Sequence, residues 1–169
     1  MMDETRFRAL YQEMYPRLWS YVHRMVPDRA QCEDHVQESF FRFLRSAPSK
    51  LSDADRRSYL YKIATNLMKD AWRGKQSEEK WLAEQGDDEP MSDTASGIAA
   101  GIDINRAMAL LSPGQQSLVW LAYVEGYEHK EIADIVGVKP TSVRVLLMRA
   151  RKRLAEYLAD DNNQIRDSK

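Results

Sequence analysis

Residues 128–154 read EHKEIADIVGVKPTSVRVLLMRARKRL, and this segment predicts two helices joined by a tight turn. Apolar residues recur at helical intervals up to Gly137, and a glycine at that place is typical of a helix end. Pro140 and Thr141 then open a second, longer helix, since proline is favoured in a first turn. Such spacing is typical of a helix-turn-helix.

The second helix of this pair is strongly basic, and no acid appears before Glu156. One face carries Val143, Leu147, Ala150 and Leu154, and we expect this face to pack on the preceding helix through Ile132 and Val136. The opposite side is left for DNA, because an uncompensated basic helix in second position suggests a recognition helix. The alternative is a solvated basic face on an ordinary terminal helix.

The position of each residue along this helix predicts what it would contact. The first residues of a recognition helix reach base edges, and later basic residues reach phosphates. The candidates for base contacts are Thr141, Ser142, Arg144, Val145 and Met148. The candidates for phosphate contacts are Arg149, Arg151, Lys152 and Arg153.

Composition bounds the class of protein. The chain has 169 residues, of which 30% are charged, and its net charge is −1, so any nucleic-acid contact must come from local basic patches. Its one cysteine, Cys32, excludes a disulfide within the chain and fits a reducing cytoplasm. No apolar run is long enough to span a bilayer, and the N-terminus lacks the plan of a signal peptide. We therefore expect a cytoplasmic protein without membrane insertion.

Helical patterns dominate the chain, and we expect an all-α fold. The first 73 residues contain no glycine, and no alternating strand pattern occurs. The expected N-terminal helices span residues 3–25 with a break at Pro16, residues 29–46, and residues 56–74 after a polar loop. Ser112 and Pro113 predict a further helix start, and Gly126 predicts its end.

A change of composition divides the chain into two small helical domains. Residues 84–93 contain five acids and no base, which is typical of a linker. The expected parts are an N-terminal helical domain at residues 1–76, a flexible acidic linker at 77–101, a helix-turn-helix domain at 102–160 and a polar tail at 161–169.

The predicted helix at residues 29–46 has an acidic face that could bind a protein. Asp34, Gln37 and Glu38 stand three and four residues apart and so share one side of the helix. Phe41 falls on the same side, where a fully solvated helix would not favour an aromatic ring. A plain amphipathic surface helix is the alternative.

The third predicted helix combines bases with aromatic residues. Residues 56–75 hold six bases and one acid, interleaved with Tyr59, Tyr61 and Trp72. Basic groups bind phosphates and aromatic rings can stack on unpaired bases, so this helix suggests single-stranded nucleic acid. The alternative is that the rings are core and the bases only surface. In either case we expect Tyr59 or Tyr61 to be partly buried.

Three motifs in this order resemble a known family. They are Glu-Asp-x-Val-Gln-Glu-x-Phe from residue 33, Tyr-Leu-x-x-Ile-Ala-x-Asn-Leu-x-x-Asp-x-x-Arg from residue 59, and Glu-Ile-Ala…Val-Gly-Val…Ser-Val-Arg…Arg-Ala-Arg-x-x-Leu from residue 131. Together they resemble the two-domain extracytoplasmic-function sigma factors, which are subunits of bacterial RNA polymerase in the sigma-70 family. The resemblance covers nearly the whole chain.

The resemblance implies a role for each segment. The partners would be core RNA polymerase, through its β′ clamp helices and β subunit, promoter DNA and, as is often so in the family, an anti-sigma factor. The clamp-binding residues would be Asp34, Gln37, Glu38 and Phe41. The minus-ten DNA residues would be Lys62, Asn66, Lys69 and Arg73, near the loop at residues 48–57. The minus-thirty-five DNA residues would be Thr141, Ser142, Arg144, Val145, Met148, Arg149, Arg151 and Lys152. The acidic linker would lead towards the RNA-exit path.

No catalytic or cofactor chemistry is expected. His23, His35 and His129 are scattered, and Cys32 with His35 would give too few ligands for a zinc site. Phosphate-binding glycine loops and nucleophile motifs are not found. We expect a sigma factor that binds polymerase and opens promoters. The alternatives are a helix-turn-helix regulator that is not a polymerase subunit, and an interaction module whose basic helix docks on an acidic partner.

Overall fold

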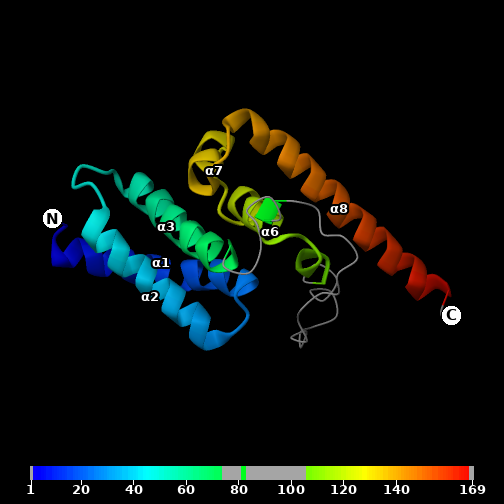
Figure 1. Ribbon diagram of the computed structural model, residues 1–169, viewed down its shortest axis with the longest axis horizontal. Coiled ribbons are helices and arrows are strands. Elements are labelled where there is room, and N and C mark those ends of the chain that lie inside the picture. The colour runs from blue at the N-terminus through cyan, green and yellow to red at the C-terminus, as the bar shows by residue number, and fades with distance from the viewer. Residues whose placement is uncertain (1, 74–80, 83–105, 168–169) are drawn as a thin grey trace.

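A computed structural model describes residues 2–73, 81–82 and 106–167. Throughout these residues the regular elements are helices, with no strand, which confirms the all-α prediction (Figure 1). The helices are α1 (Glu4–Met25), α2 (Arg29–Ser46), α3 (Asp53–Arg73), α6 (Pro113–Val119), the π-helix η1 (Trp120–Val124), α7 (His129–Val136) and α8 (Pro140–Asp167). Within the same residues no helix combines the length and the apolarity that a membrane crossing needs.

Helix α1 continues through Pro16, so the expected break there is wrong. Proline removes one backbone donor from a helix interior and normally weakens it. Here Met14 and Leu18, on either side of Pro16, are both fully buried in the same core. Packing on both sides of the proline therefore keeps the helix continuous.

Local capping explains where α2 and α3 begin. The Asp28 carboxylate accepts a hydrogen bond from the backbone N–H of Gln31 at 2.9 Å and so caps α2. The Ser52 hydroxyl accepts the N–H of Asp55 at 3.1 Å, and α3 therefore begins at Asp53, three residues before its expected start. The loop that joins these helices is correspondingly shorter, covering residues 47–52.

The C-terminal domain contains the predicted helix-turn-helix. Ser112 and Gln115 form a reciprocal capping box at the start of α6, as the Ser-Pro pair predicts. After α6 the chain continues as the π-helix η1, and Gly126, two residues beyond its end, has a φ of 72°. Gly137 ends α7 in the left-handed conformation, with a φ of 80°, and α8 begins three residues later. The turn geometry thus agrees with the prediction from glycine and proline.

The buried face of α8 packs on two helices, not one. Val143 and Leu147 lie in the same buried cluster as Ile132 and Val136 of α7, as expected. Ala150 instead packs with residues 108, 111 and 119 beside and within α6, and Leu154 lies against them. The first two turns of α8 are thus positioned by α7 and the next two by the α6 side, because a 28-residue helix outruns the short α7.

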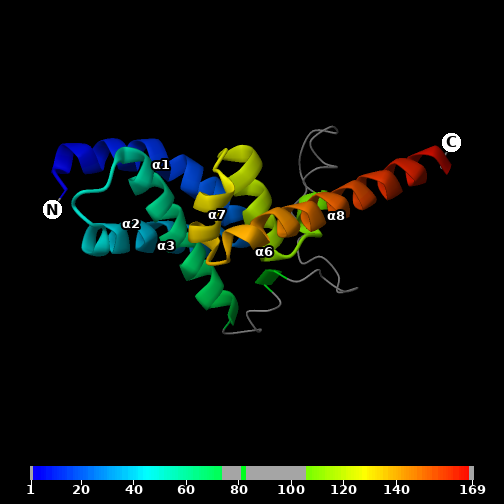
Figure 2. The ribbon, with the colours of Figure 1, turned by 90° about the horizontal axis from the view of Figure 1, so that it is seen from above.

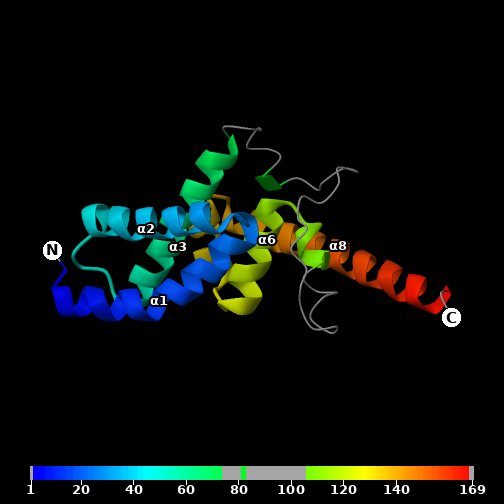
Figure 3. The same ribbon diagram turned by 90° about the horizontal axis from the view of Figure 1, so that it is seen from below.

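The two domains pack against each other in the free chain. Leu60 and Ala64 of α3 share one buried cluster with Leu118 of α6 and Ile132 of α7. Helices α3 and α7 lie side by side, whereas the C-terminal half of α8 extends away from the rest of the protein (Figures 1 and 2). Seen from below, α1 lies beside α6, which gives a second contact between the two domains (Figure 3).

Part of the predicted linker takes part in the packing. Trp81 is 2% exposed, and its ring meets that of Trp72 edge-to-face with centroids 6.0 Å apart. Its backbone and ring also lie against Gly114 of α6. The acidic residues of the predicted linker, at 84–93, lie outside the described residues.

Candidate nucleic-acid and partner interfaces

The side of α8 that faces away from α6 and α7 is open along its first three turns. Of the predicted DNA residues, Ser142 is half-buried, and the exposed ones are Thr141, Arg144, Val145, Met148, Arg149, Arg151 and Lys152. Val145 and Met148 are 40% and 55% exposed, although both are apolar. The structure therefore brings the predicted base-contact and phosphate-contact residues together on one accessible side of the helix.

Arg153 has a different environment from its basic neighbours. Its guanidinium lies 5.4 Å from the centroid of the Tyr157 ring, and the residue is half-buried. Cation–π contacts of this kind hold an arginine along its own helix. Arg149, Arg151 and Lys152 are the more accessible candidates for phosphate.

The predicted protein-binding side of α2 is accessible as well. Asp34 and Gln37 are exposed, Phe41 is 53% exposed, and Glu38 is held by Arg42 at 2.7 Å. Leu44 is 50% exposed and follows Phe41 by three residues, so it extends the apolar part of this side by one turn. The three-residue spacing between Phe41 and Leu44 is the sequence signal that could have identified Leu44.

The four predicted minus-ten residues on α3 do not form one open surface. Asn66 and Arg73 are exposed. The Lys62 ammonium lies 3.0 Å from the Asp134 carboxylate of α7. Lys69 is only 6% exposed, and its ammonium donates to the backbone carbonyl of Val136 at the end of α7. In this arrangement the C-terminal domain covers half of the predicted site.

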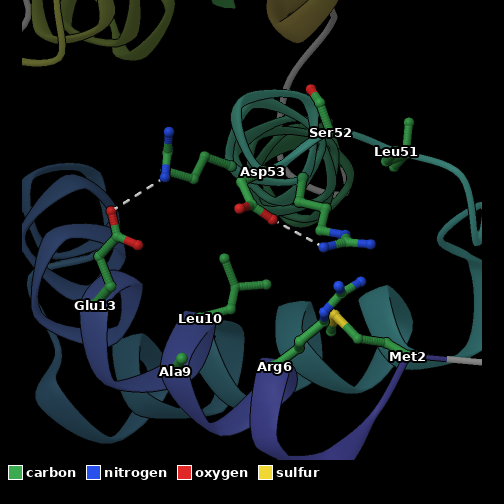
Figure 4. A pocket seen from close by; sticks show the side chains of 10 residues that line it. Met2, Arg6, Ala9, Leu10, Glu13, Leu51, Ser52 and Asp53 are labelled. Carbon is green, nitrogen blue, oxygen red and sulfur yellow. Dashed lines mark hydrogen bonds and ion pairs between the residues drawn. The ribbon is translucent and has the colours of Figure 1, made fainter.

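A pocket of about 360 Å³ lies between the N-terminal half of α1 and the loop that leads into α3 (Figure 4). Apolar side chains such as Leu10 and Leu51 line it together with three arginines, Arg6, Arg56 and Arg57. The Arg56 guanidinium is paired with Asp53 at 2.9 Å, and the Arg57 guanidinium with Glu13 at 3.4 Å. The pocket is lined mainly by polar and charged groups, with three guanidinium groups and two carboxylates beside a few apolar side chains.

Glu125 is a buried acid that sequence reasoning missed. Its side chain is 4% exposed, it accepts a hydrogen bond from the Tyr61 hydroxyl at 2.6 Å, and it is paired with the Arg17 guanidinium. Burial acts to lower the pKa of Arg17, but the hydrogen bond and the charge of Glu125 outweigh it and raise that pKa. Burial, followed by the bond to Glu125, raises the pKa of the Tyr61 hydroxyl. Three residues from α1, α3 and the end of η1 thus form one polar cluster between the domains.

Metal-binding geometry is not found in the described part of the chain, where no group of three or more His, Cys, Asp or Glu side chains could hold an ion. Cys32 is buried, and burial raises the pKa of its thiol to about 11. Its sulfur lies 3.7 Å from the carbonyl oxygen of Trp19. Cys32 is therefore a packed core residue.

Comparison with known protein families finds two matches in chain order. Residues 10–78 match the model of sigma-70 region 2, and residues 102–154 match the model of sigma-70 region 4. The first match covers α1 from Leu10 onward, α2 and α3, and the second covers α6, η1, α7 and the first half of α8. Both halves of the chain are therefore similar to regions of one family.

Relatives that cover most of the chain give the same result. The ECF RNA polymerase sigma factor SigL of Mycobacterium tuberculosis is 30% identical over 157 residues, which are 90% of this chain and 88% of that protein. The RNA polymerase sigma factor CarQ of Myxococcus xanthus is 26% identical, over 93% of this chain and 91% of that protein. Among solved structures, the sigma factor RpoE of Bartonella quintana, in complex with the anti-sigma factor NepR, is similar in fold, with a TM-score of 0.69 at 21% identity over 91% of this chain and 97% of that one.

Proposed function

Because the chain belongs to the sigma-70 family, as an extracytoplasmic-function RNA polymerase sigma factor, we propose a specific division of work between its interfaces. Sigma factors bind core RNA polymerase and promoter DNA to initiate transcription. In this chain the outer side of α2 binds polymerase, α3 and the loop before it hold the opened minus-ten element, and α8 reads the minus-thirty-five element. The regulator that is not a polymerase subunit is not favoured, because the N-terminal domain matches sigma-70 region 2.

The observation that carries this proposal is the accessible side of α8 in the same chain as the accessible side of α2. On α8, the exposed Arg149, Arg151 and Lys152 are the residues we expect at phosphates, and the exposed Val145 and Met148 are those we expect at base edges. An apolar residue at that place suits contact with a thymine methyl group. Sequence-specific binding on one domain and protein binding on the other is the combination that a promoter-specificity subunit needs.

The polymerase contact rests on the mixed character of the α2 surface. Asp34 and Gln37 offer acceptors, while Phe41 and Leu44 offer apolar area at the same side of the helix. Protein interfaces typically combine an aromatic anchor with polar groups around it. The expected contacts are the β′ clamp helices for α2 and the β subunit for the C-terminal domain. Polymerase is cytoplasmic, and we infer the same location for this protein.

Promoter opening requires a place for unpaired bases, and the pocket in Figure 4 is our candidate. Leu10 and Leu51 would contact a planar base, and Arg6, which also lines the pocket, is the cation that we propose for the phosphate of that nucleotide. A flipped base held in a protein pocket compensates for the stacking that it loses. Asn66 lies exposed on α3, the helix whose first turns carry Arg56 and Arg57.

Two further functional statements follow from family membership. The chemistry of RNA synthesis belongs to the core enzyme, so we propose that this chain contributes binding and no catalytic group. Because the similar RpoE structure contains an anti-sigma factor, we also propose control by such a partner, which would cover the surfaces that bind polymerase.

Permanganate footprinting on promoter DNA with core polymerase tests the proposal. The wild-type protein should make thymines near the transcription start reactive, because permanganate oxidises unpaired thymine. A variant that combines Asn66→Ala with replacement of residues 48–51 by glycine should lose this reactivity but keep the upstream footprint of α8. Asp34→Lys with Glu38→Lys should abolish both signals by preventing polymerase binding. A wild-type protein that binds promoters with polymerase but never opens them would refute the assignment of α3.

A further inference from the structure

Met148 places a sulfur atom on the open side of α8. Its side chain is 55% exposed, and it follows the exposed Arg144 by four residues and the exposed Val145 by three. Residues three and four apart share one side of a helix. The thioether of Met148 therefore lies among the side chains that we assign to base edges, and in the free protein it is open to small molecules in solution.

The other methionines that the structure describes are less accessible than Met148. Three of them are buried in the core and two are half-buried. The buried ones are Met14, Met68 and Met108, and the half-buried ones are Met2 and Met25. A dissolved oxidant must reach the sulfur of a thioether before it can react, and a buried side chain is reached only when the protein opens locally. Of the described methionines, Met148 should thus react first.

The one cysteine of the chain does not compete for an oxidant. Cys32 is buried, and burial raises the pKa of its thiol to about 11. The thiolate is the reactive form of cysteine, and a thiol with this pKa is almost fully protonated at neutral pH. Among the residues that the structure describes, the accessible sulfur that an oxidant can attack is therefore that of Met148.

Hydrogen peroxide converts a thioether into a sulfoxide by transfer of one oxygen atom. A lone pair of the sulfur attacks one peroxide oxygen, the O–O bond breaks, and the attacked oxygen stays on the sulfur. The other oxygen leaves as hydroxide and takes the proton of the transferred oxygen, so that water forms. The sulfur loses two electrons and the peroxide gains them. The product, methionine sulfoxide, is a polar and chiral side chain.

A sulfoxide at position 148 would change what α8 presents to the major groove. The thioether is apolar and suits contact with a thymine methyl group. A sulfoxide oxygen in the same place would lose its water without gaining a hydrogen-bond donor, which is unfavourable. Arg149, Arg151 and Lys152 would keep their charge and their attraction to phosphates. Oxidation should therefore weaken sequence-specific binding and leave non-specific binding unchanged.

We propose that Met148 is an oxidation site on the promoter-recognition surface, where a peroxide converts the thioether to the sulfoxide and thereby weakens reading of the minus-thirty-five element. The inference rests on the proposed role of α8 in reading that element. Methionine sulfoxide reductases remove the added oxygen, with one enzyme for each sulfoxide epimer, so the modification is reversible. DNA bound to α8 covers the sulfur and protects it.

Peptide mass spectrometry tests the selectivity of oxidation in the folded protein without DNA. Trypsin cleaves after Arg144 and Arg149 and releases residues 145–149, whose mass rises by one oxygen atom when Met148 is oxidised. In dilute hydrogen peroxide, Met148 should react about tenfold faster than the buried Met14 and Met68. Saturating promoter DNA with polymerase should slow its reaction about tenfold, because only the unbound fraction reacts at full rate. Equal rates for Met148 and the buried methionines would overturn the proposal.

Promoter binding measures the consequence of oxidation. The protein is treated with peroxide, the peroxide is removed with catalase, and core polymerase is then added. The treated wild type should bind promoter DNA about tenfold more weakly than the untreated protein, which is within the cost of one lost base contact. Its binding to DNA without a promoter should stay the same, and methionine sulfoxide reductases should restore promoter binding. Full affinity of the oxidised protein for the promoter would overturn the proposal.

Two variants assign the loss to one sulfur atom, each compared with itself before and after peroxide. Met148→Leu removes the sulfur but keeps an apolar side chain of high helix propensity, so its affinity should not change on treatment. Met25→Leu removes a half-buried thioether of α1 instead, and its tenfold loss should remain. An equal loss in Met148→Leu would refute the inference alone. Untreated wild-type protein that bound no promoter with polymerase would refute the proposed function and, with it, this inference.

Discussion

Replacing Gly114 with alanine should disturb the docking of Trp81, because α6 leaves no room for a side chain at that position. A Cβ at residue 114 would lie 2.8 Å from Cδ1 of Trp81, 2.6 Å from Cδ2 of Leu82 and closer still to the carbonyl oxygen of Trp81. The Leu82 side chain could rotate, but a backbone oxygen can move only with its segment. The substitution therefore forces residues 81–82 away from α6.

The expected cost can be bounded from the packing. Overfilling a packed site costs roughly 1–3 kcal/mol, and the higher helix propensity of alanine returns up to about 1 kcal/mol. The net loss of stability should be about 1–2 kcal/mol. Complete expulsion of Trp81 sets the upper limit, since an aromatic side chain buries about 150–250 Å², or roughly 4–6 kcal/mol at 25 cal/mol per Å².

Urea unfolding followed by circular dichroism gives the stability, and chymotrypsin cleavage after Trp81 reports the position of that residue. Cleavage should be slow in the wild type, where Trp81 is 2% exposed, and faster in Gly114→Ala. Gly126→Ala is the control, because its Cβ would meet nothing within 4 Å while its φ of 72° strains any other residue. That strain costs about 1–2 kcal/mol without moving Trp81. If Gly114→Ala kept wild-type stability and slow cleavage at Trp81, the described packing of Trp81 on α6 would be wrong.

Two further predictions concern the DNA-binding helix and the buried thiol. Alanine at Arg149, Arg151 or Lys152 should weaken the binding of double-stranded DNA of any sequence. The slope of log K against log salt should fall in magnitude by about 0.9 for each phosphate that the variant no longer neutralises. An unchanged slope in fluorescence anisotropy titrations would exclude that residue as a phosphate ligand. Cys32 should react slowly with a disulfide reagent at pH 8 until urea unfolds the protein, since burial raises its pKa from 9.0 to about 11 and keeps it a thiol. Because the pKa of Cys32 is higher in the folded state, the stability that the buried thiol contributes is fully present below pH 9 and is lost as the pH rises through 11. Thermal unfolding between pH 7 and 11 would measure this loss. Rapid labelling of the native protein would show instead that Cys32 is accessible.

Local sequence signals predicted the presence and approximate bounds of the helices and most of the side chains on them that face solvent. Gly137 and Pro140 predicted the turn, and the 3.6-residue period predicted that Val143 and Leu147 would be buried and Met148 exposed. Such features depend on neighbours within one or two turns. Proline at position 16 was misjudged because packing of the residues around it, which a local rule does not include, outweighs one missing hydrogen bond.

The contacts between the domains could not be predicted in the same way. Lys69 looked like a surface base in a basic helix, and Glu125 was an isolated acid before a glycine. Their partners are 67 and 108 residues away, and no periodic pattern links such positions. Trp81 stood in a segment whose composition indicated a linker, yet a single large ring can dock wherever a glycine leaves space for it. Roles that depend on pairing between distant parts of the chain become visible only in the folded structure.

The Glu125 cluster also limits how freely the two halves of this protein can be exchanged with those of relatives. Arg17 and Tyr61 come from one half of the chain and Glu125 from the other. A chimera that replaces only the N-terminal half would leave the buried Glu125 carboxylate with unmatched partners, and one that replaces only the C-terminal half would leave Arg17 and Tyr61 without that carboxylate. Engineers who recombine such proteins to build orthogonal gene circuits would do well to transfer the three positions as a set. Natural recombination within this group would meet the same restriction, and substitutions at residues 17, 61 and 125 should then be inherited together.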